Sequence, residues 1–100
     1  MSTLTLAFVA KIVAKPETAG EVATFLAGAV DLANDEAGTP VWFALRTDDT
    51  TFWIVDAFAS ETDRQAHING PIAAALLANA DRLLATAPEI LPADILAAKV

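Results

Sequence analysis

The middle of the chain alternates like a β-hairpin with two apolar faces, and this feature restricts the fold more than any other. Residues 41–46 and 52–59 are aromatic and β-branched runs, and the polar residues 47–51 between them have the composition of a turn. Successive side chains of a strand point to opposite faces, so a turn centred on Asp49 divides the hairpin into two sets. The first set is Trp42, Ala44, Arg46, Phe52, Ile54, Asp56 and Phe58, and the second is Val41, Phe43, Leu45, Trp53, Val55 and Ala57.

The second set contains no polar side chain. One face of such a sheet packs against helices, and the other meets water unless a partner covers it. We therefore expect a homodimer in which Trp53 anchors the interface. The interface residues would be Val41, Phe43, Leu45, Trp53 and Val55.

The segment before the hairpin predicts a strand followed by a helix. Residues 4–15 are rich in β-forming types and end at Pro16, which suits the first turn of a helix. From Glu17 to Ala33, apolar residues recur at three- and four-residue spacing, as on one face of an amphipathic helix. Gly38 then ends this segment.

The segment after the hairpin predicts two helices and a last strand. Residues 60–63 resemble a capping box that starts a short helix through about Ile68, and Pro71 opens a longer helix that Pro88 closes. The apolar residues 90–100 predict a strand that begins after Pro92, because proline lacks a ladder donor. The order βαββαβ is that of a ferredoxin-like α+β fold, an antiparallel sheet with helices on one face. With 100 residues, we expect one domain over 1–100.

Composition excludes several classes of function. The net charge of −7 opposes binding to nucleic acid and to anionic membranes. The sequence has no cysteine and one histidine, so we expect no disulfide and no metal site. It has no membrane-length apolar run and no basic, apolar leader, so we expect a cytoplasmic protein.

His67 is the first candidate for a catalytic group, since a histidine has its ordinary pKa near neutrality and can act as a general base. Asp56 lies on an otherwise apolar strand face, where it could orient the imidazole ring. Each residue also has a structural interpretation. A histidine at a helix end commonly caps carbonyl groups or packs against a sheet, and a buried aspartate is satisfied by any suitable hydrogen-bond donor.

Other residues could hold a flat substrate. Trp42 and Phe58 share the face of Asp56 and would form an aromatic wall, with Ile54 between them. Asn69 follows the histidine and could donate a hydrogen bond to a substrate oxygen. Such an aromatic pair is more often simply core, and Asn69 is explained as part of a turn. We interpret five acidic residues of loops and helix ends as solvated, namely Asp31, Asp35, Glu36, Asp48 and Asp49.

Four short motifs occur in the order and spacing of a known family. They are Ala14-Lys15-Pro16, Glu36-Ala37-Gly38 before Trp42, Asp56-Ala57-Phe58, and His67-Ile68-Asn69-Gly70-Pro71. Over nearly its whole length the chain thereby resembles the antibiotic biosynthesis monooxygenase family of the dimeric α+β barrel superfamily. The resemblance implies oxidation of a small quinol or polycyclic phenol by O2, with no metal or organic cofactor.

The chain also departs from that family. Trp42 replaces a common tyrosine, Asp56-Ala57-Phe58 replaces a Glu-x-Trp ending, and Ile72 replaces a second histidine. Haem-degrading relatives of the same fold carry an axial histidine where this chain has Leu77, which disfavours haem degradation.

Three functions are therefore open. The first is a cofactor-independent monooxygenase with His67 as base and Asp56 as its orienting group. The second is a dimer without catalysis that binds a small aromatic molecule or serves as an accessory protein. The third is an isomerase or lyase that uses His67 on a carbon acid. A cavity beside His67 large enough for a ring would favour the first, a filled space would favour the second, and oxygen independence would favour the third.

Overall fold

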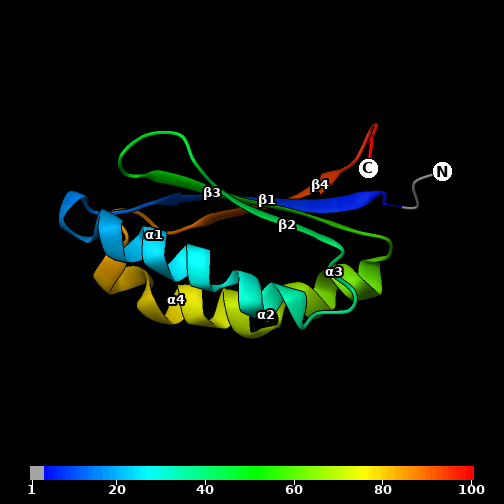
Figure 1. Cartoon of the computed structure of the whole chain (residues 1–100), viewed down its shortest axis with the longest axis horizontal. Helices are drawn as coiled ribbons and strands as arrows, with labels where there is room; N and C mark the ends of the chain where they lie inside the picture. Colours follow the sequence, from blue (N-terminus) through cyan, green and yellow to red (C-terminus); the bar gives the residue numbers. More distant parts are fainter. Residues whose placement is uncertain (1–3) are drawn as a thin grey trace.

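The computed structural model describes residues 4–100 as a four-stranded antiparallel sheet with all helices on one side (Figure 1). The strands lie in the order β2-β3-β1-β4. Their bounds are Leu6–Val13 for β1, Val41–Arg46 for β2, Thr51–Phe58 for β3 and Glu89–Asp94 for β4. The helices are η1 (Pro16–Thr18), α1 (Ala19–Gly28), α2 (Val30–Asn34), α3 (Glu61–Ile68) and α4 (Pro71–Leu83). This arrangement confirms the predicted ferredoxin-like α+β fold.

Local signals at the helix ends act as predicted. The Ser60 hydroxyl accepts a hydrogen bond of 3.1 Å from the Asp63 amide and so caps α3. Pro71 occupies the first turn of α4, where its missing amide hydrogen costs nothing. The helix predicted from residue 17 is divided, however, into η1, α1 and α2. Its main break follows Gly28, a weak helix former, and the Ala29 amide there bonds to both the Phe25 and Leu26 carbonyls.

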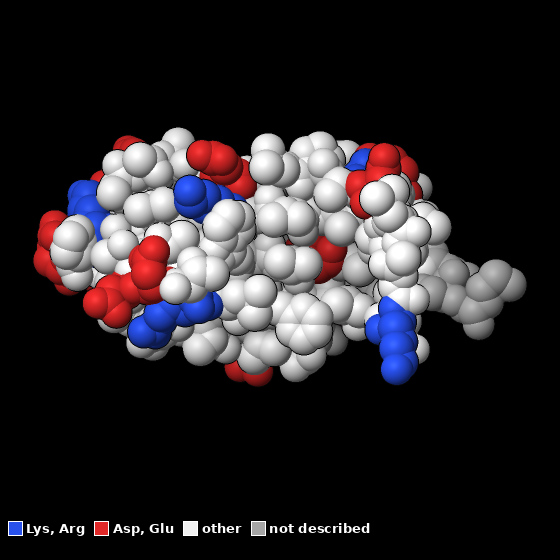
Figure 2. Space-filling model, turned by 90° about the horizontal axis from the view of Figure 1, so that it is seen from above, with Lys and Arg blue, Asp and Glu red and all other residues white. Residues whose placement is uncertain are grey.

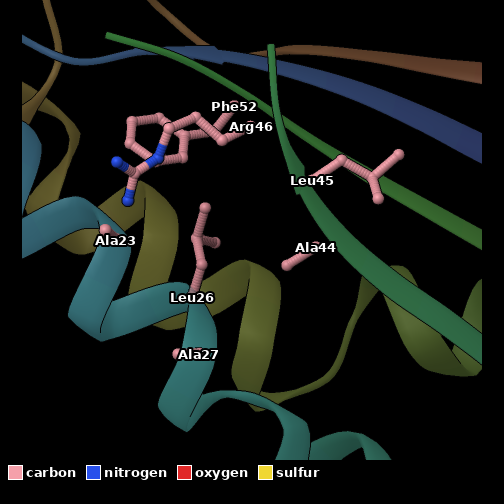
Figure 3. A pocket seen from close by; sticks show the side chains of 7 residues that line it. All are labelled: Ala23, Leu26, Ala27, Ala44, Leu45, Arg46 and Phe52. Carbon is pink, nitrogen blue, oxygen red and sulfur yellow. The ribbon is translucent and has the colours of Figure 1, made fainter. Parts of the chain in front are cut away.

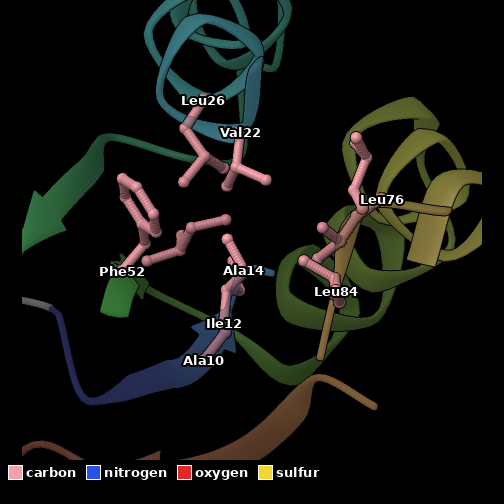
Figure 4. Packing of buried hydrophobic residues seen from close by; sticks show 10 residues of the cluster. Ala10, Ile12, Ala14, Val22, Leu26, Phe52, Leu76 and Leu84 are labelled. Carbon is pink, nitrogen blue, oxygen red and sulfur yellow. The ribbon is translucent and has the colours of Figure 1, made fainter. Parts of the chain in front are cut away.

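The core lies between the sheet and the helices (Figure 4). Val22 and Leu26 of α1 face Ile12 and Phe52 of the sheet, and Leu76 of α4 closes the cluster from the other side. All five side chains are buried. Because these residues come from four elements far apart in the chain, their packing fixes helices α1 and α4 against the sheet.

The strand predicted to begin after Pro92 begins earlier, at Glu89, and Pro92 pairs with Phe8 inside it. The physical reason is the position of β4 at the edge of the sheet. The Ile95 amide bonds to the Thr5 carbonyl, so alternate residues of β4 face β1, and Pro92 falls on the outward set. A proline nitrogen there interrupts no ladder bond.

The face of the sheet opposite the helices is mainly apolar and open, with Lys11 and Glu89 as its charged residues among the paired strand positions. The register aligns Phe43, Val55, Val9 and Leu91 in one row across all four strands. Phe43, Leu91 and Leu45 are 56%, 54% and 48% exposed. Figure 2 views this side and shows mainly uncharged atoms across its middle. The predicted division of the hairpin into two faces is therefore confirmed. Among residues 4–100, no helix is long and apolar enough to cross a membrane.

Candidate functional site

His67 lies at the end of α3 and is held between two carboxylates. Its Nε2 atom is 2.9 Å from Asp56 Oδ2, and its Nδ1 atom is 2.6 Å from Glu36 Oε1. The imidazole ring is 6% exposed, and its centroid lies 5.3 Å from that of the Phe58 ring. We call Glu36, His67 and Asp56 the His67 cluster. It joins the loop after α2 to helix α3 and to strand β3.

Asp56 is the most deeply buried charged group of the cluster, with 1% of its surface exposed. Its position in the middle of β3 follows from strand alternation, which points it toward the helices. Besides the contact with His67, its Oδ1 atom accepts a hydrogen bond of 3.1 Å from the Phe8 amide of β1. Both carboxylate oxygens are thus bonded, which offsets the cost of removing the charge from water.

Glu36 completes the cluster, and the expectation that it is solvated is wrong. Its Oε1 atom also accepts a hydrogen bond of 2.9 Å from the Thr39 hydroxyl, and its side chain is 19% exposed. The Oε2 atom is buried and has no hydrogen-bond partner within residues 4–100. The sequence signal that could have indicated this role is the Glu36-Ala37-Gly38 motif, because it places an acid at a tight connection before β2.

The two short contacts determine how many protons the cluster holds. A ring nitrogen and a carboxylate oxygen at hydrogen-bond distance need a proton between them, since two lone pairs repel. The three groups therefore share two protons, which corresponds to an imidazolium between two carboxylates. Burial lowers the pKa of His67, but the hydrogen bonds and charges of Asp56 and Glu36 raise it more, to above its ordinary value of 6.5.

Asp56 and His67 form the polar part of a small hollow between sheet and helices. The hollow has a volume of about 30 Å³, and the rest of its wall is mainly apolar, including Phe8, Ile54, Ile72, Leu76 and Ile90. We call this space the His67 hollow. A volume of that size holds one or two water molecules, whereas benzene occupies engineered cavities of about 150 Å³.

The structure brings together some of the predicted site residues and separates others. Asp56, His67 and Ile54 line the His67 hollow, whereas Trp42, Phe58 and Asn69 are not among its lining residues. Trp42 lies opposite Asp56 in the ladder and packs against Ala29, Ala33 and Ile72. Phe58 is fully buried, and Asn69 follows α3 with its amide bonded to the Gln65 carbonyl.

Solved structures similar to this chain include a near relative and more distant ones. The NE2512 protein of Nitrosomonas europaea, described as of unknown function, is 50% identical, with a TM-score of 0.95 over 98% of this chain and 95% of that one. PA3566 of Pseudomonas aeruginosa is 22% identical, with a TM-score of 0.79 over 94% and 96% of the two chains. A protein of Nitrosomonas europaea described as a "putative antibiotic biosynthesis monooxygenase" is 14% identical, with a TM-score of 0.80 over 92% and 90%. No family model and no curated protein matches the sequence.

Proposed function

Since the chain belongs to the family of the NE2512 protein and has the fold of antibiotic biosynthesis monooxygenases, we propose that it is a monooxygenase of that type. The substrate is a small quinol or polycyclic phenol, the oxidant is O2, and no cofactor takes part. The observation that carries the proposal is the Asp56–His67 pair in the wall of an otherwise apolar hollow. A base in a mainly apolar wall suits the oxidation of a phenol, provided that the hollow widens to admit the ring.

In the proposed reaction, His67 accepts the phenolic proton through a ring nitrogen that carries none, and Asp56 keeps the ring oriented. The phenolate gives one electron to O2, and the resulting superoxide and aryloxyl radical combine at a ring carbon that bears hydrogen. His67 returns its proton to the peroxide anion, and the resulting hydroperoxide loses water to leave a quinone. One oxygen atom of O2 ends in the product and the other in water.

This role requires His67 to give up one of its two contacts. With both protons present the imidazole cannot accept a third, so the reactive form has lost one proton. Because the pKa of His67 is raised, that form becomes more abundant as pH rises. We therefore expect turnover to increase with pH through the pKa of His67.

Substrate entry also requires the His67 hollow to widen beyond about 30 Å³. In this proposal the hollow widens on the side formed by β4 and α4. β4 is an edge strand held by one neighbour, and its Ile90 is only half-buried across from Leu76 of α4. An Ile90→Ala variant enlarges the hollow on this side and leaves the residues of the His67 cluster unchanged. It should raise the turnover of the larger, polycyclic substrates.

The test is oxygen uptake by the purified protein with dihydroxynaphthalenes, anthrones and simple quinols, in the presence of a chelator. We expect uptake above autoxidation that falls at least tenfold in His67→Gln, a variant that keeps a hydrogen-bond donor in place of the ring. Circular dichroism and thermal melting establish that the variant is folded. Equal turnover in a folded His67→Gln protein would remove His67 from the reaction.

The small volume of the His67 hollow favours a second candidate, a dimer without catalysis that binds a small aromatic molecule or serves as an accessory protein. In this function the His67 cluster is purely structural. No uptake over the whole panel by folded wild-type protein and by Ile90→Ala would favour this candidate over the first.

For either function we propose a homodimer formed through the open face of the sheet. The exposed Phe43, Leu45 and Leu91 support it, because monomeric proteins rarely expose large contiguous apolar patches. Light scattering coupled to size exclusion should give a dimer for the wild type and a monomer for Phe43→Asp. The matched control is Ala78→Asp on the exposed side of α4, which should stay dimeric. A monomeric wild type would contradict the proposal.

A further inference from the structure

A second hollow, larger than the His67 hollow and sharing no lining residue with it, lies between α1 and the edge strand β2 (Figure 3). Its volume is about 140 Å³. We call it the α1–β2 hollow. Its wall is formed by Ala23, Leu26 and Ala27 of α1, by residues 44–46 of β2, and by Phe52 of β3.

Small side chains make this space. Ala23 and Ala27 stand on the α1 side and Ala44 on the β2 side, where longer side chains would close the gap (Figure 3). Leu26 and Phe52 supply an apolar floor that is continuous with the core. The volume approaches the cavity of about 150 Å³ that holds benzene in an engineered protein, so one ring or a short branched chain fits.

Arg46 places a positive charge at one end of the hollow. Its guanidinium lies 5.2 Å from the centroid of the Phe52 ring and extends toward α1 (Figure 3). Within residues 4–100 it forms no ion pair, whereas Arg64 and Arg82 pair with Glu61 and Glu21 at 2.6 and 2.7 Å. In a chain with a net charge of −7, an arginine without an acidic partner beside an apolar hollow is available for an anionic ligand.

The free edge of β2 adds hydrogen-bond donors at the same place. The Thr47 amide bonds to the Thr51 carbonyl at 3.0 Å, which makes Leu45 and Trp53 a hydrogen-bonded pair of the ladder. The amides of Ala44 and Arg46 therefore face the outer edge, where no strand follows β2. A carboxylate held by the Arg46 guanidinium would lie close to these donors.

We propose that the α1–β2 hollow binds a small carboxylate with an aromatic or branched apolar body. The body occupies the space between the alanines and Phe52, and the carboxylate pairs with Arg46. Of the lining residues, Leu45 alone directs its side chain to the opposite face of the sheet (Figure 3), so a partner on that face leaves the space between α1 and β2 accessible. It is independent of the reaction proposed at His67.

Benzoate is a suitable probe, with benzyl alcohol as its uncharged analogue and acetate as the carboxylate without a ring. In a titration followed by amide NMR shifts, we expect benzoate to bind with a dissociation constant on the order of 1 mM. The amides of Ala23, Ala27 and Ala44 should shift, and that of Ala73 in the His67 hollow should not. Acetate and benzyl alcohol should bind at least tenfold more weakly, since each lacks half of the recognition.

Two pairs of variants make the test specific. Arg46→Gln should weaken benzoate binding about tenfold, whereas Arg82→Gln, at another exposed arginine, should leave it unchanged. Ala27→Leu should fill the hollow and abolish binding, whereas Ala78→Leu on the exposed side of α4 should not. Equal binding of benzyl alcohol and benzoate, or shifts confined to the His67 hollow, would overturn the proposal, as would the absence of any binding. None of these results depends on whether the protein consumes O2.

Discussion

Replacing His67 by leucine removes the cation between two carboxylates. Asp56, 1% exposed, would keep only its 3.1 Å hydrogen bond from the Phe8 amide, and Glu36 would keep the Thr39 hydroxyl. Leaving one charge of a buried pair without its partner costs about 3–5 kcal/mol. For a chain of 100 residues, that loss lowers Tm by roughly 12–25 °C.

The cause of this loss can be separated from simple loss of packing by a second variant. Asp56→Asn in the His67→Leu background removes the stranded charge and keeps an oxygen for the Phe8 amide. If the penalty is electrostatic, the double variant should recover at least about 1–2 kcal/mol of the free energy of unfolding. Urea denaturation at pH 7, with an unchanged slope against denaturant, measures each value. A loss below about 1 kcal/mol in His67→Leu, or strictly additive losses, would refute the electrostatic account.

Two further predictions concern the contacts of His67, and a third concerns the cap of α3. Glu36→Gln removes one of the two carboxylates that raise the pKa of His67, whereas burial still lowers this pKa. The pKa of His67 should therefore fall, and NMR titration of the single histidine measures the change directly. Because the folded-state pKa of His67 is raised, the contribution of His67 to stability should be complete below pH 6.5 and should be lost as pH rises through the folded pKa. Denaturation at several pH values measures this contribution as the difference in free energy of unfolding between wild type and His67→Leu. Ser60→Ala removes the cap of α3 and should cost about 1 kcal/mol, which thermal melting detects.

The fold could be predicted largely because its signals are local. Alternation in residues 41–58 assigned each hairpin side chain to the correct face, and the Ser60 cap set the start of α3. Pairing of Asp56 with His67 also followed from position, since a strand face and a helix end were expected to meet. These features depend on a few neighbouring residues, for which periodicity and capping are informative.

The errors concern features that depend on tertiary contacts. Glu36 follows two other polar residues and looks solvated in sequence, but the folded loop brings its Oε2 atom close to Gly70, where an added Cβ would lie 3.7 Å away. Pro92 looks like a strand breaker, and only the placement of β4 at the edge of the sheet makes it harmless. The volume of the His67 hollow was likewise beyond prediction, because it depends on how α4 packs over β1 and β4.

The contacts that stabilise His67 also restrict its chemistry. Stability and catalysis therefore require different protonation states of the ring, and this difference can distinguish a structural cluster from a catalytic one. The doubly protonated ring joins three elements but cannot accept a proton, whereas the singly protonated ring can accept one and has lost an ion pair. Rising pH should therefore decrease the free energy of unfolding and increase turnover through the same pKa. In Glu36→Gln both transitions should move to lower pH together. If stability changes with pH while turnover does not, the His67 cluster is structural and the reaction, if present, uses another base.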